Sequence, residues 1–463
     1  MVFLINHELW GSNPAGYHVF LLLLHLANVA LVYLLIRKLA TASPMAAMFG
    51  AATFALHPTR VESIAWLSGI TDPLTIFFLL GALLAHRAFI ENAGRWRYFT
   101  LSLLCLQMAL WSKEVAIIFP LIVVVHDYIY RKKINWTTIL AYTFMVVAYL
   151  VIRSKILGTI GNVDALNMPS FSMILNFVLG YSELLVFPVE IPFYMQLPEH
   201  PISSTLRWIS AIAIIALAGF CWKVFNQSRK NGLAFSAIWF ILFFWPAILI
   251  LLYMEGFAAR LLYVPAVGVA IFTAILYDHI SEEYQSMKHY VMSSFALLVC
   301  LYGTLTWYEI PAWQDDGAFY GRVTEVLPES PAGYNGLGSF YMKREDYVSA
   351  EKNYLLSSQK AKTNPDRSKS FLALGTIYGI TNKLELSERY LKAALIIDPN
   401  NSEALVGLGN LAWMNNQFTE AISHYEKAIA ARAGNLEAAS NLAMAYEKLG
   451  EFERAESIRR NIR

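Results

Sequence analysis

Apolar stretches long enough to cross a bilayer dominate the chain up to about Trp307, and polar residues return from Glu309 onward. A spanning helix needs roughly twenty apolar residues, and by that criterion the first part holds about ten segments. They lie near residues 17–36, 44–56, 64–86, 98–111, 115–130, 136–152, 206–222, 234–253, 261–277 and 290–307. The second and fourth are short and end at charged clusters, which is typical of helices that stop at a polar cavity. We therefore expect an all-α fold whose residues 1–308 form a polytopic membrane domain.

The polar remainder of the chain repeats with a helical period. Pairs of Leu with a small residue recur there, the last three one 34-residue period apart: Leu337-Gly338, Leu374-Gly375, Leu408-Gly409 and Leu442-Ala443. Small residues at these positions let two helices approach closely, and stacked hairpins bury a face that none could bury alone. The pattern resembles the tetratricopeptide repeat and predicts about four repeats in an α-solenoid over residues 331–463. Residues 309–330 are predicted to be a linker.

Basic residues in the short loops set the orientation that we predict for the membrane part. They fall on one side if the segments alternate, and that side is then cytoplasmic: Arg37-Lys38, Arg87, Arg95, Arg97, Arg131 to Lys133, Lys223, Arg229-Lys230 and Lys288. The apolar stretch 171–187 is interpreted as a re-entrant or interfacial helix, because a further span there would reverse the later loops. We therefore expect a multi-pass protein of the cell (inner) membrane, with the long loop 153–205 and the repeats on the extracytoplasmic side.

Composition excludes several classes of function. The 463 residues are 57% hydrophobic and 15% charged, with a net charge of +2 and a mean hydropathy of +0.44. No basic face suited to nucleic acid is present. The sequence has no Walker loop, dinucleotide fingerprint, nucleophile elbow or Cys/His metal spacing, so we predict no cofactor and assign no metal ligand. His18 and His25 lie seven residues apart, and we interpret them as partnered polar residues rather than metal ligands.

The stretch 54–72, FALHPTRVESIAWLSGITD, ends a hydrophobic segment with a cluster of titratable side chains. His57, Arg60, Glu62 and Asp72 lie in it, next to segments apolar enough to cross a bilayer. Ionisable groups at membrane depth are costly to bury and commonly mark a functional site. The alternative is a turn between two membrane helices in which Arg60 pairs with Glu62 at the headgroups.

Two further places put charge next to apolar segments. Lys113 and Glu114 carry opposite charges, which suits either a neutralised structural pair or the binding of an anionic headgroup or acceptor. Arg260, followed by Tyr263, suits either a bidentate hold on a phosphate or an interfacial anchor. A lipid-linked phosphate that arrives through the bilayer needs only cationic holders and one carboxylate base.

Several stretches follow one another as in the transmembrane and tetratricopeptide-repeat O-mannosyltransferases, and more closely as in the bacterial relatives of that family. They are NPAGYHVFLLLLHLANVALVYLL, ALHPTRVESIAWLSGITD, WSKEVAIIFPLIVVVHDY, RLLYVPAVG and WQDD. The resemblance implies a membrane domain like that of type C glycosyltransferases, which use polyprenyl-phosphate sugars, followed by outward-facing repeats. In the family a first membrane helix and an acidic outward loop with the presumed catalytic Asp precede NHELWGSNPAGYH. This chain begins after them, so we expect either that its start is misassigned or that the protein lacks this base.

The resemblance also implies roles for individual residues. His57, Arg60, Glu62 and Asp72 correspond to the family's second outward loop. Lys113 and Glu114 correspond to its SK or SKE motif. Arg260 and Tyr263 correspond to its RYLYLP-like motif. We assign to catalysis Glu62, Asp72 and His57, and to binding of the donor phosphate or substrate Arg260, Lys113, Glu114, Arg60 and Tyr263. Two positions depart from the family: Ala259 stands where many relatives carry Glu, and Thr71 where many carry a basic residue.

These observations lead to two hypotheses. In the first, the chain is a membrane glycosyltransferase that moves a sugar of the mannose type from a polyprenyl-phosphate carrier to a protein or glycan acceptor outside the cytoplasm. Arg260 and Lys113 would hold the donor phosphate, Glu62 would orient the acceptor, and the repeats would bind that acceptor. In the second, the chain is a non-catalytic membrane scaffold whose repeats recruit protein partners, which the missing acidic loop favours.

Overall fold

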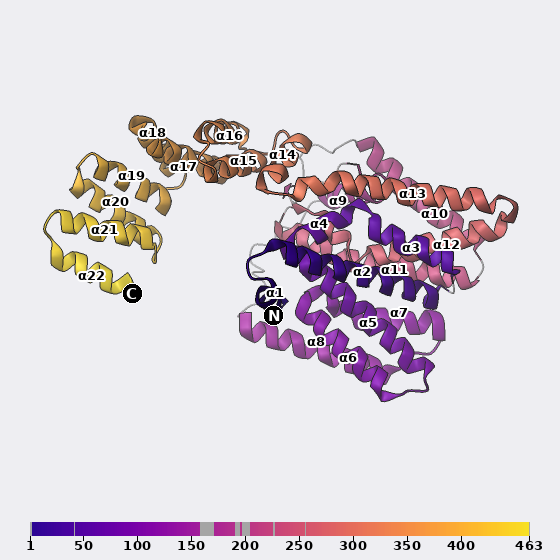
Figure 1. Ribbon diagram of the computed structural model, residues 1–463. Helices are drawn as coiled ribbons and strands as arrows, with labels where there is room; N and C mark the ends of the chain where they lie inside the picture. The colour runs from indigo at the N-terminus through magenta and orange to yellow at the C-terminus, as the bar shows by residue number, and fades with distance from the viewer. Residues whose placement is uncertain are drawn as a thin grey trace. The chain divides into compact units, whose positions relative to one another are not determined.

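The computed structural model describes residues 2–40, 42–157, 171–189, 195–196, 204–225, 227–254 and 256–462. It divides into two compact units, Met1–Trp313 and Gln314–Arg463. Helices make up almost all of both (Figure 1), so the predicted all-α class is confirmed. The strands in the described residues are one short antiparallel pair, β1 (Met195–Gln196) with β2 (Gly256–Phe257).

The first unit is built from helices that are joined by short turns and, around the polar clusters, by short helical segments. The helices are α1 (Val2–Trp10), α2 (Pro14–Leu39), α3 (Pro44–Leu56), α4 (Val61–Ala65), α5 (Thr71–Glu91), α6 (Trp96–Ser112), α7 (Phe119–His126), α8 (Trp136–Leu157), α9 (Phe171–Val186), α10 (Ser204–Val224), α11 (Gln227–Met254), α12 (Ala266–Glu283) and α13 (Lys288–Glu309). The short segments are η1 (Pro58–Arg60), η2 (Leu67–Ile70), η3 (Glu114–Ile118), η4 (Asp127–Arg131), η6 (Ala259–Leu262), η7 (Gln285–Met287) and η8 (Ile310–Trp313).

Apolar side chains cover much of the outside of this unit, as well as its core. Phe144, Ile156, Ile215 and Leu297 are each more than 70% exposed. A surface of this kind is costly in water and typical of a protein that lies in a membrane. Within the described residues, five helical stretches are long and apolar enough to cross a bilayer: Pro14–Leu39, Leu67–Glu91, Trp136–Ile156, Thr205–Val224 and Gln285–Trp313. The number of about ten spans remains a prediction.

Small residues determine how closely the central helices pack. A Cβ atom on Gly50 of α3 would lie 2.4 Å from the carbonyl oxygen of Ala270 in α12. One on Gly268 of α12 would lie 2.4 Å from the carbonyl oxygen of Ser236 in α11. Glycine at these two positions therefore lets α12 lie against both neighbours, and the main apolar core forms around this contact.

Helices α5 to α8 pack against one another at one edge of the first unit (Figure 1). Helix α5 places Asp72 in its first turn and His86 near its end. At a rise of 1.5 Å per residue, these two side chains lie about 20 Å apart along the helix axis. Helix α5 therefore connects two separate polar clusters. The predicted long loop 153–205 lies partly outside the described residues, and its described part contains α9.

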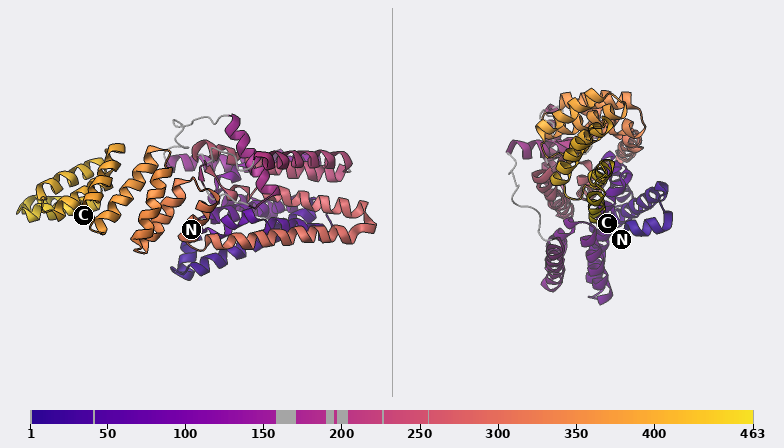
Figure 2. Two further views of the ribbon diagram at one scale, coloured as in Figure 1. Left: turned by 90° about the horizontal axis from the view of Figure 1, so that it is seen from above. Right: turned by 90° about the vertical axis from the view of Figure 1, so that its left-hand side faces the viewer.

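The second unit begins with α14 (Asp316–Val326), within the residues predicted to be a linker, and continues as helical hairpins stacked side by side (Figure 2). The hairpin helices are α15 (Pro331–Lys343), α16 (Tyr347–Lys360), α17 (Asn364–Ile380), α18 (Leu384–Ile397), α19 (Ser402–Met414), α20 (Phe418–Ala431), α21 (Leu436–Lys448) and α22 (Phe452–Ile462). Equivalent left-handed residues turn the chain inside each hairpin: Glu345, Asn382, Asn416 and Gly450, with φ of 60°, 58°, 58° and 81°. The backbone therefore repeats with the period seen in the sequence.

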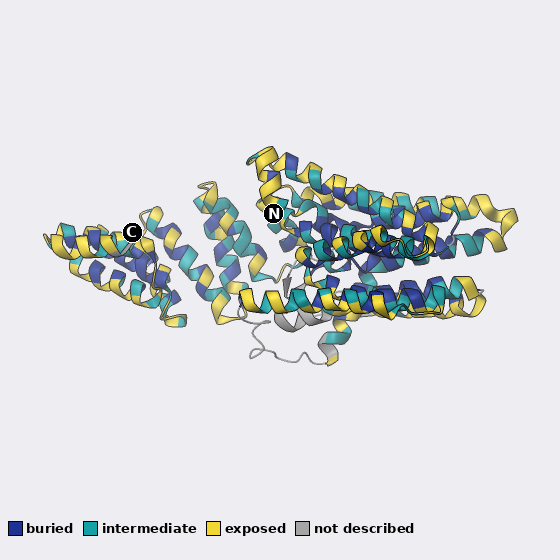
Figure 3. Ribbon diagram, turned by 90° about the horizontal axis from the view of Figure 1, so that it is seen from below, coloured by how far each residue is buried: buried dark blue, intermediate teal, exposed yellow. Residues whose placement is uncertain are grey.

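Glycine explains the close packing of each hairpin. A Cβ atom on Gly338, Gly375 or Gly409 would come within 2.9, 2.7 and 2.4 Å of a side chain on the partner helix, namely Tyr354, Leu391 and Tyr425. Buried residues occupy the faces on which the helices meet, and exposed residues occupy the outer faces (Figure 3). The Gly positions therefore have the physical role that the sequence predicts for them.

Candidate functional site

The stretch 54–72 is folded as a series of short helical turns between α3 and α5. Helix α3 ends at Leu56, and His57 is extended there with φ of −67° and ψ of 128°. The side chain of His57 then caps η1, because its Nδ1 atom accepts from the backbone N–H of Thr59 at 3.4 Å and lies 2.8 Å from the Thr59 Oγ1 atom. The segments η1, α4 and η2 follow in sequence. These tight turns bury His57, Arg60, Glu62 and Asp72, each no more than 3% exposed.

Glu62 is paired with a residue far away in the sequence. One carboxylate oxygen forms an ion pair with the guanidinium of Arg260, and the other accepts from the Arg260 backbone N–H at 2.9 Å. Arg260 lies in η6 and its guanidinium also stacks on Trp66, 4.7 Å from the ring centroid. The backbone before η6 is held by Tyr181 of α9, whose hydroxyl donates to the carbonyl oxygen of Ala258 at 2.8 Å. Helix α9 and η6 therefore fix the position of Arg260.

Asp72 and Lys113 form a second ion pair. The Lys113 Nζ atom lies 2.6 Å from Asp72 Oδ1. The Asp72 side chain is 4% exposed, that of Lys113 is 23% exposed, and the other oxygen, Asp72 Oδ2, is buried with no hydrogen-bond partner in the described part of the chain. Lys113 follows the last residue of α6 in an extended conformation, which turns its side chain toward the start of α5. Asp72 therefore keeps one free acceptor atom.

Arg60 carries a positive charge that no carboxylate balances among the described residues. Its guanidinium lies beside two aromatic rings that pack against each other, with Cζ 5.5 Å from the centroids of both Phe54 and Tyr263. Its Nε and Nη1 atoms are buried and have no hydrogen-bond partner in the residues that the structure describes. Burial lowers the pKa of Arg60 to about 10, so the guanidinium stays charged near neutral pH. A buried charge of this kind is costly unless an anion binds beside it.

Tyr263 belongs to a network of hydrogen bonds behind Arg60. Its hydroxyl lies 2.8 Å from His25 Nδ1 and accepts from the Asn28 side-chain amide at 3.3 Å. The Nε2 atom of His25 in turn lies 3.2 Å from the carbonyl oxygen of Ala55. His25 is therefore a partnered polar residue, as its spacing from His18 led us to expect, while His18 is exposed. These hydrogen bonds fix the ring of Tyr263, against which the Arg60 guanidinium lies.

Burial determines the protonation of the two titratable groups beside Arg60. Burial and the nearby charge of Arg60 lower the pKa of His57 to about 3, so the imidazole is neutral near neutral pH. Burial also raises the pKa of Glu62 above the ordinary value of 4.5, although the positive charge of Arg260 acts in the opposite direction. A carboxyl group with a raised pKa suits general acid or base chemistry near neutral pH.

The structure brings most of the predicted site residues together. Glu62 with Arg260, Asp72 with Lys113, and Arg60 with Tyr263 lie around one region, and His57 lies next to it. The alternative pairing of Arg60 with Glu62 is wrong, because Glu62 pairs with Arg260 instead. Glu114 is not part of this group, since its side chain is about half exposed and pairs with Arg153.

Three residues of this region were missing from the sequence prediction. Trp66 stacks on Arg260, Asn28 donates to Tyr263, and Ser63 has a buried hydroxyl with no hydrogen-bond partner in the described part of the chain. The sequence gives a weak signal for Trp66 and Ser63, since both lie inside the stretch 54–72. Asn28 gives none, because a single polar residue in an apolar helix has many explanations.

Comparisons with known proteins agree with both parts of the sequence interpretation. The tetratricopeptide repeat model matches residues 368–401 and 412–459. A protein O-mannosyl-transferase of Caenorhabditis elegans is 24% identical over 369 residues, which is 76% of this chain and 51% of that protein. Protein O-mannosyl-transferase TMTC3 of Homo sapiens is 22% identical over 495 aligned positions, which cover 93% of this chain and 53% of the human protein.

One relative matches a shorter part of the chain with a higher sequence identity. Protein O-mannosyl-transferase Tmtc1 of Drosophila melanogaster is 34% identical over 115 residues, 25% of this chain and 13% of that protein. The chain spans about half the length of the Caenorhabditis elegans and human relatives. The relatives confirm the resemblance to the transmembrane and tetratricopeptide-repeat O-mannosyltransferases.

Proposed function

We propose that this chain transfers a sugar of the mannose type from a polyprenyl-phosphate carrier to a protein or glycan acceptor on the extracytoplasmic side of the membrane. The names of its relatives support glycosyl transfer to protein. The observation that carries the proposal is the buried, unbalanced guanidinium of Arg60, beside the Glu62–Arg260 and Asp72–Lys113 pairs. A phosphate group supplies the negative charge that such a site needs.

The donor phosphate would contact three cationic side chains. Arg60 supplies two buried N–H-bearing atoms that lack partners within the described chain. A guanidinium has five N–H donors, so Arg260 can remain paired with Glu62 and still donate to a phosphate oxygen. Lys113 is partly exposed beside Asp72 and can contribute a third positive charge. These cations would stabilise the negative charge that develops on the leaving phosphate.

The transfer step breaks one bond and forms another. The bond between the anomeric carbon and the phosphate oxygen breaks, and its electron pair stays on the polyprenyl phosphate. The acceptor hydroxyl oxygen bonds to the same carbon, and its proton passes to a carboxylate. Glu62 and Asp72 are the candidates for this base, and the raised pKa of Glu62 suits the role. His57 is buried and neutral beside Arg60, and it would help to position these groups.

A transfer assay tests this proposal on the protein extracted from its native membrane. The donor is a radiolabelled mannosyl polyprenyl phosphate, and the readout is label in protein or glycan. We expect transfer by the wild type and a strong loss in Arg260→Ala and Asp72→Asn. Transfer that is unchanged in both variants contradicts the roles assigned here, and the absence of wild-type transfer contradicts the activity.

One observation favours the second candidate, a membrane scaffold. Both carboxylates of the site, on Glu62 and Asp72, already pair with a cation, so in the described residues neither is a fully free base. The repeats also carry an open pocket of about 160 Å³, lined by Asn410, Trp413, Met414, Tyr425, Asn441 and Met444. A scaffold would bind protein segments at the repeats and transfer no sugar, and the same assay with a peptide-binding measurement separates the two candidates.

A further inference from the structure

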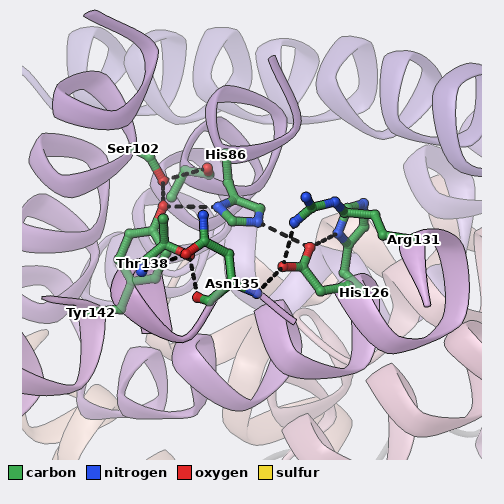
Figure 4. Close-up of polar contacts among 9 residues, drawn as sticks. His86, Ser102, His126, Arg131, Asn135, Thr138 and Tyr142 are labelled. Carbon is green, nitrogen blue, oxygen red and sulfur yellow. Dashed lines mark hydrogen bonds and ion pairs between the residues drawn. The ribbon is translucent and has the colours of Figure 1, made fainter. Parts of the chain in front are cut away.

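A second cluster of titratable side chains lies near the other end of α5, away from the candidate site. His86 of α5 meets His126 at the end of α7 and Asp127 at the start of η4 (Figure 4). The three side chains are no more than 3% exposed. Neither the sequence motifs nor the proposed sugar transfer assigns them a role, so their arrangement needs its own explanation.

The ligand atoms of the cluster have the spacing of a metal site. Asp127 Oδ1 lies 3.3 Å from His86 Nε2 and 3.1 Å from His126 Nδ1. The three candidate ligand atoms all lie within 4.8 Å of one another. Two ligands of a tetrahedral zinc ion, each about 2.0–2.1 Å from the metal, are about 3.4 Å apart. The cluster is therefore already close to the geometry that a divalent ion requires.

The hydrogens of the neighbouring hydroxyl groups determine which nitrogen of His86 carries a proton. The single hydrogen of the Ser102 hydroxyl is donated to the carbonyl oxygen of Ala82 at 2.8 Å. Tyr142 must then donate its own hydrogen to Ser102 Oγ, 2.8 Å away. The Tyr142 oxygen is left to accept from His86 Nδ1 at 3.1 Å. In neutral His86 the proton is therefore on Nδ1.

This protonation leaves an unfavourable contact. The unprotonated Nε2 atom of His86 directs its lone pair at the Asp127 carboxylate oxygen, and two acceptors at 3.3 Å repel each other. A cation between them turns the repulsion into attraction. A metal-bound histidine that donates its other ring N–H to a fixed acceptor is the usual arrangement around such ions, and Tyr142 is that acceptor here.

The far side of Asp127 is also held as in a metal site. Its second oxygen, Oδ2, lies 2.9 Å from Arg131 Nη1 and 3.4 Å from the backbone nitrogen of Asn135. These contacts keep Oδ1 directed at His86 and His126. Ligating carboxylates are commonly hydrogen-bonded in this way by groups behind them.

We propose that His86 Nε2, His126 Nδ1 and Asp127 Oδ1 bind a divalent transition-metal ion such as Zn²⁺. Two imidazoles and one carboxylate suit zinc, cobalt or nickel better than magnesium or calcium, which prefer oxygen ligands. The ion would join α5 to the end of α7 and to η4, the segment that also contains Arg131. The site is independent of the sugar-transfer proposal, since it lies about 20 Å along α5 from Asp72.

Cobalt binding tests the proposal on the full chain, purified in detergent without a histidine tag and freed of metal with a chelator. Co²⁺ in an imidazole and carboxylate site absorbs visible light, and Zn²⁺ should displace it. We expect about one Co²⁺ per chain. His86→Gln and His126→Gln should each reduce binding more than tenfold, while His289→Gln, on an exposed part of α13, should not. No absorption in the wild type, or unchanged absorption in a variant that combines His86→Gln with His126→Gln, overturns the proposal.

A gentler pair of variants keeps the test valid if the glutamine variants fold poorly. Tyr142→Phe keeps the ring and removes only the acceptor for His86 Nδ1, so Co²⁺ affinity should fall about 10- to 100-fold. Tyr130→Phe is the matched control, because the buried Tyr130 hydroxyl has no hydrogen-bond partner in the described residues. Equal Co²⁺ affinities in these two variants would contradict the arrangement proposed here, because they would show that the Tyr142 hydroxyl does not hold His86 Nδ1 for metal binding.

Discussion

Helix α5 carries two buried polar clusters that differ in how their charged groups are partnered. Around its start, Arg60 is a cation without a balancing carboxylate in the described residues, although Glu62 and Asp72 lie near. Near its end, His86 Nε2 lies 3.3 Å from one carboxylate oxygen of Asp127, and the other oxygen pairs with Arg131. The first cluster therefore suits an anion and the second a cation. The comparison teaches that the partners of a buried charge indicate a ligand better than the charge alone.

The largest expected effect concerns the unbalanced cation. Arg60→Met should lower the rate of sugar transfer about 100-fold, because removal of one donor to a developing negative charge typically has this cost. The unfolding temperature of the ligand-free protein should not fall, since the change removes a buried charge that lacks a partner. Transfer kinetics and thermal unfolding measure the two effects.

The exposed Arg95→Met serves as the control for Arg60→Met. A variant at Arg60 that unfolds at lower temperature but still transfers sugar would mean that Arg60 has a structural role. The contrast between the two ends of α5 would then be lost.

The next effect concerns Asp72, which has one partner. Lys113→Met should lower the free energy of unfolding by about 2 kcal/mol, because a buried carboxylate would be left unpaired. Lys38→Met removes an exposed pair with Glu91, at 3.5 Å, and should change stability by less than about 0.5 kcal/mol. Chemical denaturation of both variants measures the difference. Equal effects would show that water reaches Asp72 as freely as Glu91.

The pH dependence of stability reports on Glu62. Burial raises the pKa of Glu62 above 4.5, so the folded state keeps its proton at pH values where the unfolded chain has lost it. The contribution of the Glu62 carboxyl group to the free energy of unfolding is therefore fully present below about pH 4.5. It is lost as the pH rises through the raised pKa. The wild type should lose up to about 1.4 kcal/mol per pH unit in this window relative to Glu62→Gln. Unfolding curves of both proteins from pH 4 to 8 measure the slope.

A constant difference between the two proteins across that range would mean that the charge of Arg260 fully offsets the burial of Glu62. The site would then hold a permanently ionised pair. Glu62 would be a positioning residue rather than the base.

The smallest expected effect concerns the hydroxyl chain behind His86. Ser102→Ala removes the acceptor of Tyr142 and should lower the free energy of unfolding by about 1 kcal/mol. Ser112→Ala, on the same helix, loses only a bond to the carbonyl oxygen of Met108 one turn earlier and should cost less. Denaturation of the two variants compares them. Equal losses would show that the Ser102–Tyr142 contact does not fix His86.

Local patterns in the sequence determine most of the fold. The predicted segment 44–56 coincides with α3, because Pro44, the Ser43 cap and an unbroken apolar run define its limits. The repeat period is reproduced by the left-handed turn residues Asn382, Asn416 and Gly450. The number of membrane spans is harder to predict, since short apolar helices such as α3 and α7 can be either spans or partly buried pieces.

The candidate site could be located from the sequence but its pairing could not. A cluster of charges between apolar segments is visible in one dimension, so His57, Arg60, Glu62 and Asp72 were predicted together. The sequence suggested that Arg260 holds a phosphate or anchors the chain at the interface, because no pattern indicates that Glu62 lies against a residue 198 positions later. Proximity in the sequence suggested that Arg60 pairs with Glu62. In the structure Arg260 forms that ion pair, and Arg60 is the cation without a balancing carboxylate in the described residues.

The sequence by itself determined the helices, the repeats and the places where charge interrupts apolar segments, because these depend on periodicity and burial cost along the chain. Only the tertiary structure decided that Arg260 pairs with Glu62, that Arg60 stays unbalanced, and that His86 meets Asp127. The physical reason is distance: hydrogen bonds and ion pairs act over a few ångströms. Which side chains come that close depends on how whole helices pack, and a local pattern carries no record of that packing.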